Sequence, residues 1–434
     1  MRQSHCNADL VNRAKINRLC LLCLFLFLLC GVKLFFHPIE INEFENRYAE
    51  KLPYWTMSGW FSGSYQDQME RALADQLPFA IRSKQIYNKG FSSVNAFILD
   101  RMMECAANTM QRPLAEPDNH GGDDAETIQT IQDPTVFYWT LPDSNRQVLA
   151  GHLMYTTRFL DHEREKLDSR IENINQTIEN HPEITFYLYY IEKETDVDFI
   201  TGECSGIYEY IRSHVDSIPD NQIERFRVSS FEQFDDQFYK TDHHWNDRGS
   251  YAAYVQILRW LLPDEQPLVP LAEYDLGTMV GSKATGSSAA GYSDVFQGYE
   301  FTFPSVEIVE NGKNVPDYGS QEEVIAQYKL TKTPLREIRY GIYYGGDSGE
   351  LIFRNAASEN GSILILGESY DNALLKLLAS HYSTVYSVDL RNYEAQLGTP
   401  FSFQDYLTEH SDIDRVLLIG NVDYYVLDTF DIPQ

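Results

Sequence analysis

Short apolar segments alternate with helical segments over the last part of the chain, and this alternation limits the possible fold more than any other feature. Residues 362–367, 384–390 and 415–420 are runs of strand length that are rich in apolar and β-branched residues. Residues 370–382 and 402–410, which lie between them, have helical apolar spacing. Strands that alternate with helices form a parallel sheet with right-handed crossovers. The sequence therefore predicts the α/β class, with a parallel sheet flanked by helices.

The same alternation is already present from about residue 150. An amphipathic helix is predicted to end at His181-Pro182, with an apolar stripe at Leu167, Ile171, Ile174 and Ile178. Residues 184–191 then read as a buried strand, 205–219 as a helix and 225–230 as a short strand. Residues 247–262 have the spacing of a further helix, and Asn246 is suited to cap its first turn.

The pattern divides the chain into three parts. Residues 1–37 form a basic leader and an apolar run, and 38–135 form a helical region that ends in a polar, Gly/Pro-punctuated loop. Residues 136–434 form the α/β domain, interrupted around 263–345 by a β-rich or irregular insertion. No internal repeat is apparent.

The first 37 residues predict a membrane segment. A basic leader precedes the apolar residues 19–32, and Lys33 can snorkel so that 34–36 extend the run to about the length that crosses a bilayer. No small-residue cleavage site follows. We therefore expect an uncleaved signal-anchor, which is a single-pass transmembrane helix with the body outside the cytoplasm. The alternative is a cleaved signal peptide and a secreted body.

Charge and cysteine content exclude some function classes. The formal net charge is −29 although the leader is basic, so the body would repel nucleic acid. Four of the six cysteines lie in residues 1–37. The other two, Cys105 and Cys204, could form one disulfide in an oxidising compartment, and their spacing fits no zinc motif.

Residues 240–251, KTDHHWNDRGSY, place a carboxylate beside two imidazoles just before a predicted helix. In an extended segment, residues i and i+2 face the same side. Asp242 can then orient His244, while His243 points elsewhere and serves as a packing or supporting residue. The alternatives are a structural Asp–His hydrogen bond and a metal site, although no third ligand stands at metal spacing.

Ser369 follows the strand at 362–367 and precedes a helix, so it lies at the edge of the sheet where functional groups collect. At such a turn the free N–H groups of the helix can face a developing anion. If His244 removes the proton of Ser369 and Asp242 orients His244, the three residues form a serine triad. The alternative is a serine that only caps the helix.

The motif TDHHWN together with LGESYDNALL resembles the DHHW proteins, bacterial relatives of the SGNH hydrolase-like alginate O-acetyltransferases. Weaker matches are ENRY at 45–48, DQLPFAIR at 75–82 and SVDLRNY at 387–393. The resemblance implies an extracytoplasmic SGNH-type domain with Ser369, His244 and Asp242 in the triad roles. The relatives transfer acetyl groups to exopolysaccharide hydroxyls through an acyl-serine. They usually have Asp before the serine, where this chain has Glu368.

Five further residues are candidates for substrate or oxyanion binding. They are Tyr370, Asn372, Arg391, Trp245 and His243. For each the competing role is structural: helix capping for Asn372, core packing for Trp245 and an ion pair with Asp389 for Arg391. A Gly-Asp-Ser stretch at 346–348 is read as a turn between two strands and is rejected as the nucleophile.

The combined prediction is a serine-dependent O-acyl (acetyl) transferase or esterase acting on a cell-surface or secreted polysaccharide. Its partners would be a polysaccharide acceptor and an unidentified acyl donor, and it would need neither a metal nor another cofactor. The alternative is a non-catalytic SGNH-like module that binds an envelope glycan or a protein partner.

Overall fold

A computed structural model describes residues 128–131, 138–140, 146–285 and 292–433, the strand residues 41–42 and 47–48, and the single helical residues 65, 69 and 72. By its internal contacts the chain divides into two units, 1–91 and 92–434. The predicted membrane segment and most of the predicted helical region at 38–135 lie outside the described residues. Among the described residues, no helix is both long and apolar enough to cross a membrane.

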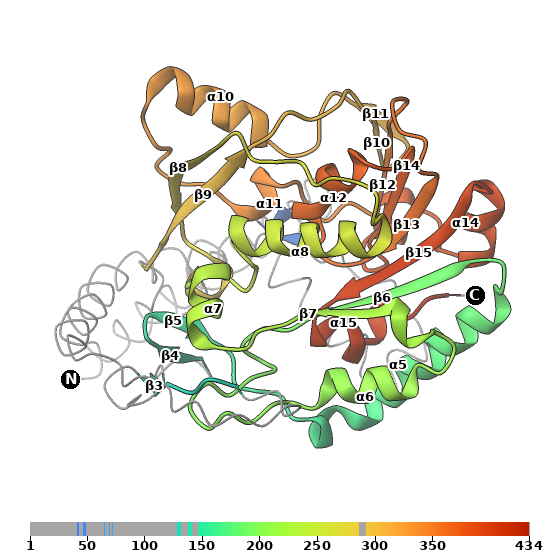
Figure 1. Cartoon of the computed structure of the whole chain (residues 1–434), viewed down its shortest axis with the longest axis horizontal. Helices are drawn as coiled ribbons and strands as arrows, with labels where there is room; N and C mark the ends of the chain where they lie inside the picture. Colours follow the sequence, from blue (N-terminus) through green and yellow to red (C-terminus); the bar gives the residue numbers. More distant parts are fainter. Residues whose placement is uncertain are drawn as a thin grey trace, which may run out of the picture. The chain divides into compact units, whose positions relative to one another are not determined.

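An eight-stranded sheet, in the order β11-β10-β12-β14-β13-β15-β6-β7, forms the centre of the second unit (Figure 1). The strands are β6 (Thr185–Ile191), β7 (Ile223–Phe226), β10 (Glu307–Glu310), β11 (Lys313–Val315), β12 (Glu350–Arg354), β13 (Ser362–Leu366), β14 (Thr384–Val388) and β15 (Ile413–Gly420). The five strands β14, β13, β15, β6 and β7 are parallel, whereas β10, β11 and β12 are antiparallel to their neighbours. The prediction of a wholly parallel sheet was therefore wrong for one edge.

Helices cover both faces of this sheet. They are α5 (Leu160–Asn180), α6 (Ile207–His214), α7 (Phe231–Gln237), α8 (Asp247–Leu261), α12 (Asn372–Ala379), α13 (Tyr393–Leu397), α14 (Phe403–Glu409) and α15 (Val422–Val426), with short 3-10 turns η2 (Asp220–Gln222) and η3 (Asp428–Phe430). In Figure 1, α8 and α12 lie on one side of the strands, and α5 and α6 on the other. The fold is thus a mixed α/β fold with a central sheet flanked by helices.

The alternation of side chains along each strand produces two hydrophobic cores. Along β13, Ile363 and Ile365 pack with α8 and α12, while Leu364 and Leu366 pack with α5 and α6. All four side chains are fully buried, so β13 lies at the centre of the sheet.

Two helices agree with their sequence patterns. The Asn246 side chain accepts hydrogen bonds from the backbone N–H groups of Arg248 and Gly249 and so caps α8, as predicted. The predicted stripe of α5 is also confirmed, because Leu167, Ile171 and Ile174 are buried. The strand expected at 225–230 lies slightly earlier, at β7.

The region 263–345 is only partly an insertion. Its hairpin pairs β8 (Ala272–Met279) with β9 (Asp294–Glu300), and its helices are α9 (Ser282–Thr285), α10 (Gln321–Thr331) and α11 (Tyr340–Tyr343). However, β10 and β11 belong to the central sheet. The Gly346-Asp347-Ser348 turn therefore joins α11 to β12, and not two strands as expected.

The remaining described strands are short. Strands β3 (Tyr138–Thr140), β4 (Gln147–Leu149) and β5 (His152–Met154) form an antiparallel sheet, and β1 (Ile41–Asn42) pairs with β2 (Arg47–Tyr48). The domain boundary predicted at 135 falls at 132–137, which lies outside the described residues.

Candidate active site

Ser369 lies in the turn between β13 and α12, at the carboxyl edge of the parallel strands. Glu368 fixes this turn to the next strand, because its buried carboxylate accepts from the N–H (2.9 Å) and the Nδ2 (2.5 Å) of Asn421. Burial raises the pKa of Glu368. Gly367 has no room for a side chain, since a Cβ there would lie 2.1 Å from Asp371 Oδ2. Glu368 therefore anchors the serine turn.

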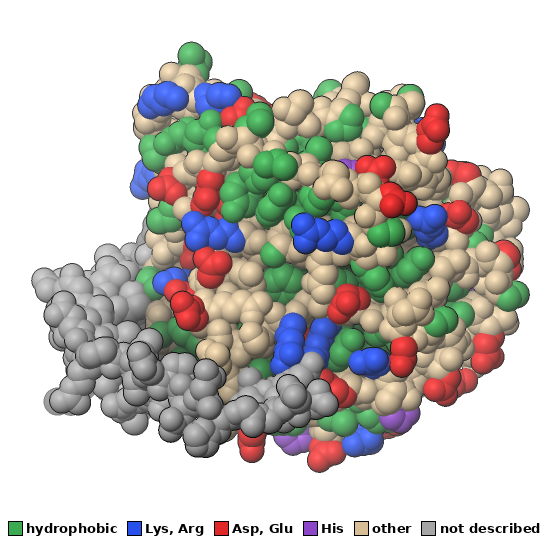
Figure 2. All heavy atoms as spheres, viewed as in Figure 1, with side chains coloured by type: hydrophobic (Ala, Val, Ile, Leu, Met, Phe, Trp, Pro, Cys, Tyr) green, Lys and Arg blue, Asp and Glu red, His purple; other side chains and the backbone are tan. Residues whose placement is uncertain are grey.

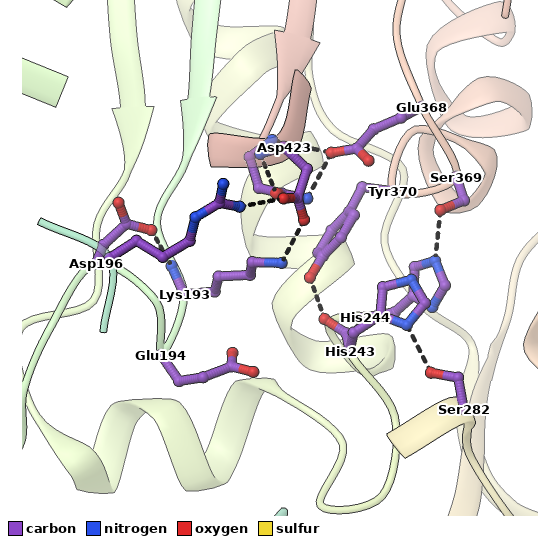
Figure 3. A network of polar contacts seen from close by, with 12 residues as sticks. Lys193, Glu194, Asp196, His243, His244, Ser282, Glu368, Ser369, Tyr370 and Asp423 are labelled. Carbon is purple, nitrogen blue, oxygen red and sulfur yellow. Dashed lines mark hydrogen bonds and ion pairs between the residues drawn. The ribbon is translucent and has the colours of Figure 1, made fainter. Parts of the chain in front are cut away.

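His244 lies within hydrogen-bonding distance of Ser369 and of Asp242. Its Nε2 is 2.8 Å from Ser369 Oγ (Figure 3), and its Nδ1 is 2.5 Å from Asp242 Oδ1. The imidazole and the carboxylate are both buried. The structure thus brings the three predicted residues together in the order that a serine triad requires.

The backbone around the histidines is a tight bend and not the extended strand end that we expected. Residues 241–244 are bent, and a bridge between Phe238 and Trp245 closes the loop. The rings of His243 and His244 therefore lie only 3.9 Å apart. The expectation that His243 points away from the site was wrong, because the bend turns both rings to one side.

Hydrogen bonds hold the Asp242 carboxylate in its charged form. Besides the His244 ring, Oδ1 accepts from the His244 N–H at 3.1 Å, and Oδ2 accepts from the Ser282 N–H at 2.7 Å. Burial alone would raise the pKa of Asp242, but His243, His244 and the Ser282 N–H together hold it well below its usual value. The carboxylate is therefore ionised across the neutral range and can stabilise an imidazolium.

Two residues that the sequence did not single out complete the support of this site. Tyr340 stacks on the His244 ring, with centroids 3.9 Å apart and planes at 8°. Ser282 Oγ lies 2.7 Å from His243 Nδ1 (Figure 3). Ser282 stands in a Gly/Ser-rich stretch and Tyr340 among other tyrosines, so neither residue stands out in the sequence.

Replacing Gly281 with Ala should disrupt the site. A Cβ there would lie 2.4 Å from the Thr241 oxygen and 2.5 Å from the Asp242 N and Cβ, which are backbone-linked atoms with no room to shift. We expect a loss of about 1–3 kcal/mol in unfolding free energy, measured by urea denaturation. Gly312→Ala is the control for a glycine without close neighbours, although its positive φ of 74° adds a small cost of its own. Equal stability of Gly281→Ala and the parent protein would contradict this account.

The structure places the other candidates in supporting roles. Tyr370 is fully buried and its hydroxyl donates to the His243 carbonyl oxygen. Trp245 is also fully buried, with its ring edge-on to Phe226 and to Tyr370. Trp245 is therefore a core residue in this structure and presents no face to a sugar.

Asn372 and Arg391 are both bound to other side chains. Asn372 Nδ2 donates to Asp347 Oδ1 at 2.9 Å, and its Oδ1 accepts from the Tyr318 hydroxyl at 3.0 Å. Arg391 Nη2 lies 2.6 Å from Asp389 Oδ2 and 3.2 Å from Asp347 Oδ2. Both side chains are therefore held by carboxylates and a tyrosine, and no hydrogen bond of either one to Ser369 is found among the described residues.

Ser348, the serine of the Gly-Asp-Ser stretch at 346–348, is 4% exposed, and its hydroxyl donates to Glu310 Oε1 at 2.5 Å. Ser348 precedes the strand β12 and not a helix, so no free N–H groups of a first helical turn follow it. The rejection of this serine as nucleophile agrees with its place in the structure.

Asp242, His243 and His244 are also the described residues that could hold a metal ion, because they offer three ligand atoms within 4.8 Å of one another. Several of the candidate ligand atoms already form hydrogen bonds: His244 Nδ1 contacts Asp242, His244 Nε2 contacts Ser369, and His243 Nδ1 contacts Ser282. Either nitrogen of His244 would lose a hydrogen bond by binding a metal, so the arrangement fits a triad better than a metal site.

Two ion-paired lysines with buried side chains act on His243. Lys193, which follows β6, lies 3.6 Å from Asp423 of α15 (Figure 3), and Arg158 also pairs with Asp423. Lys283 Nζ lies 2.5 Å from Glu194 Oε1. The charges of Lys193 and Lys283 both lower the pKa of His243, although burial is the largest cause of that shift.

The comparisons with known proteins confirm the family resemblance. A family model described as DHHW protein matches residues 179–388, which include Asp242, His244 and Ser369. No curated protein matches the chain at a significant level.

Several solved structures are similar to the chain. PatB1 of Bacillus cereus is 17% identical, with 68% of this chain and 99% of that chain covered and a TM-score of 0.49. A DHHW family protein of Eubacterium siraeum is 13% identical, with 69% and 99% covered and a TM-score of 0.46. The O-acetyltransferase domain of Pseudomonas putida AlgJ is 12% identical, with 67% and 93% covered and a TM-score of 0.37.

Proposed function

Taking residues 179–388 as a DHHW segment, we propose that this chain is a serine-dependent O-acyltransferase or esterase whose substrate is a polysaccharide outside the cytoplasm. One observation carries the proposal. His244 lies between Ser369 Oγ, at 2.8 Å, and the buried carboxylate of Asp242, at 2.5 Å. This geometry serves proton transfer from a nucleophilic hydroxyl.

In the first half-reaction, Ser369 Oγ attacks the carbonyl carbon of an acyl donor while His244 Nε2 accepts the hydroxyl proton. The bond from that carbon to the leaving oxygen breaks, and His244 returns the proton to the leaving group. In the second, an acceptor hydroxyl gives its proton to His244 and attacks the acyl carbon, which releases Ser369. A sugar hydroxyl as acceptor gives transfer, and water gives hydrolysis.

The backbone of the serine turn supplies donors for the negative charge that develops on the carbonyl oxygen. No acceptor for the N–H groups of Ser369 and Tyr370 lies within the described part of the chain. Both groups precede α12, whose first turn adds a favourable dipole. These N–H groups, and not the Asn372 amide, are our candidates for the oxyanion site.

We also propose that the body lies outside the cytoplasm, held by the apolar run at 19–32. The basic leader before that run favours this orientation. The observation that would test it is whether an externally added protease cleaves the body in intact cells.

The test of the proposed function is to find where an acyl group becomes attached. The purified chain is mixed with 4-nitrophenyl acetate, digested and mapped by mass spectrometry. We expect an acetyl adduct on the peptide that contains Ser369, retained in Ser348→Ala and absent in Ser369→Ala. A long-lived adduct that is discharged by added oligosaccharide favours transfer, and rapid turnover without acceptor favours hydrolysis.

Two results would redirect the proposal. If nitrophenolate release is the same in Ser369→Ala, serine chemistry with this donor is excluded and a polysaccharide-binding module becomes the better explanation. If a chelator abolishes release and Zn²⁺ restores it, the metal arrangement of Asp242, His243 and His244 is the better explanation.

A further inference from the structure

A cavity outside the triad contains an unpaired buried charge. It lies between the first turns of α8, the end of β9 and helix α12, and its lining includes Asp247, Tyr251, Tyr299, Phe301 and Lys376. Neither the triad residues nor Ser282 belong to this lining. The cavity is therefore a separate place on the same domain.

Asp247 is the most unusual residue in the lining. Its side chain is 2% exposed, and neither of its carboxylate oxygens has a hydrogen-bond partner among the described residues. The backbone N–H groups of Asp247 and Arg248 lie near enough to the carboxylate to lower its pKa, but neither N–H meets the geometry of a hydrogen bond. A buried carboxylate without a partner is costly, so a group that brings positive charge into the cavity would relieve that cost.

The cations near the cavity are engaged with other acids. Arg248 pairs with Asp236 at 2.8 Å and with Glu273 at 3.1 Å. Lys376 lies 2.7 Å from Asp317 and 2.5 Å from Glu322. Both basic side chains are therefore paired with other acids, and neither forms an ion pair with Asp247.

Three half-buried aromatic rings line the cavity beside this carboxylate. Tyr251, Tyr299 and Phe301 contact one another, with ring centroids 5.6 to 6.1 Å apart. Figure 2 shows hydrophobic side chains gathered over the region of α8 and β9 on this face of the molecule. Aromatic faces attract cations, and a carboxylate beside them adds a full negative charge.

We propose that this cavity binds the ammonium group of a small organic cation, with Asp247 as its counter-ion and the rings of Tyr251, Tyr299 and Phe301 around it. The inference does not depend on acyl chemistry at Ser369. The ammonium group could belong to a free amine or to an amino sugar, and the two sources differ in what else must enter the cavity.

Binding of methylammonium, which stays charged, should strengthen as the pH rises from about 6 to 8, because only the ionised carboxylate attracts a cation. Burial, and then the charge of Glu273 on β8, raise the pKa of Asp247 to about 7, while Arg248 on the same helix opposes the shift. The other titratable groups that face it are Tyr299 on β9, Tyr343 and Tyr344 at α11, and Tyr239. A bound ammonium lowers the pKa of Asp247, so binding near neutral pH releases a proton.

The test is a calorimetric titration of the full chain at constant ionic strength, in buffers of different ionisation enthalpy. The probes are methylammonium and glucosamine, each compared with a neutral counterpart, methanol or glucose. We expect Asp247→Asn to weaken binding of both ammonium probes at least about tenfold and to abolish the proton release. Phe301→Leu should weaken binding about threefold. Tighter binding of glucosamine than of methylammonium would identify an amino sugar as the source.

The matched control is Asp405→Asn, which removes an exposed acid from the first turn of α14 and should leave binding unchanged. Asp247→Asn should melt no lower than the parent, because it removes an unpaired buried charge. Neutral probes that bind as tightly as the ammonium probes, or ammonium binding that survives both Asp247→Asn and Phe301→Leu, would overturn the proposal.

Discussion

Replacing Asp242 with Asn lowers the rate constant for acylation of Ser369 by about 10⁴-fold at neutral pH. Asp242 Oδ1 accepts from His244 Nδ1 at 2.5 Å, and Oδ2 accepts from the Ser282 N–H at 2.7 Å. An amide keeps one acceptor oxygen but turns an NH₂ group toward one of these two donors. If the NH₂ faces His244, the imidazole takes the tautomer that cannot accept the serine proton.

The control for this prediction is a second Asp–His pair on the same domain. Asp235 Oδ1 lies 2.8 Å from His152 Nε2, and this hydrogen bond lowers the pKa of Asp235 to about 2. Asp235→Asn should therefore reduce stability but leave the acylation rate within about twofold, because it lies outside the triad. The measurement is single-turnover release of nitrophenolate, with thermal melting of both variants. An acylation rate in Asp242→Asn within tenfold of the parent rate would show that Asp242 does not orient the base.

The pH dependence of acylation follows from the same contacts. The folded pKa of Asp242 is held below its unfolded value, so its ionised form stabilises the fold above that unfolded value, and this contribution is lost as the pH falls through the folded pKa. Asp242 therefore stays charged across the neutral range. The acylation rate should show no ionisation of Asp242 between about pH 5 and 8.

The elements predicted correctly from the sequence are those with a strong local pattern. In β13 an uninterrupted apolar run of strand length fits a strand buried on both faces, and in α5 a stripe at helical spacing fits a helix with one buried face. Strand direction is not a local property. The antiparallel pairing of β12 with β14 joins segments that β13 and α12 separate in the sequence, and no residue pattern reveals it.

Helix α10 is an element without a strong local pattern in the sequence. Val324 and Ile325 are buried in α10, but Leu330 is 86% exposed, so the helix has no continuous apolar stripe to predict it from. The hairpin of β8 and β9 joins segments separated by a loop, and its register comes from contacts such as the close approach of Gly298 to the Tyr343 ring. These contacts are tertiary, so a single sequence does not carry them.

The sequence predicted those residues of the candidate site that lie in distinctive motifs. Asp242, His244 and Ser369 stand in short, chemically distinctive stretches, and the geometry unites them. Ser282 and Tyr340 act on the histidines through contacts that span tens of residues of sequence. Their residue types are common in loops and cores, so no sequence signal separates them from their neighbours.

Replacing Lys283 with Met lowers the unfolding free energy by about 3–5 kcal/mol. Lys283 and Glu194 are 1% and 0% exposed, and Lys283 Nζ lies 2.5 Å from Glu194 Oε1. Removing the lysine leaves the Glu194 carboxylate buried, with Lys193 as its remaining cation nearby. The measurement is urea unfolding, with Lys329→Met as control. Lys329 pairs with Glu300 at 2.6 Å but is 45% exposed, so its loss should cost under about 1 kcal/mol.

The pH dependence of the unfolding free energy lost in Lys283→Met shows whether Lys283 stabilises the fold by its charge or by its packing. Burial alone would raise the pKa of Glu194, but Lys283 and Lys193 outweigh it and hold the pKa below its usual value. In the parent protein, the ionised Glu194 carboxylate therefore stabilises the fold at pH values above the usual pKa of a glutamate. This stabilisation is lost only as the pH falls through the lowered pKa of the folded state. In Lys283→Met the buried Glu194 carboxylate should take up a proton more easily. The difference in unfolding free energy between the variant and the parent should therefore become smaller below about pH 5. A deficit that is constant with pH, or that remains after Glu194→Gln is added to Lys283→Met, would mean that Lys283 stabilises α9 by packing and not by its charge. Because Ser282 precedes Lys283 and its N–H holds Asp242, loss of the pair by either cause should also slow acylation of Ser369.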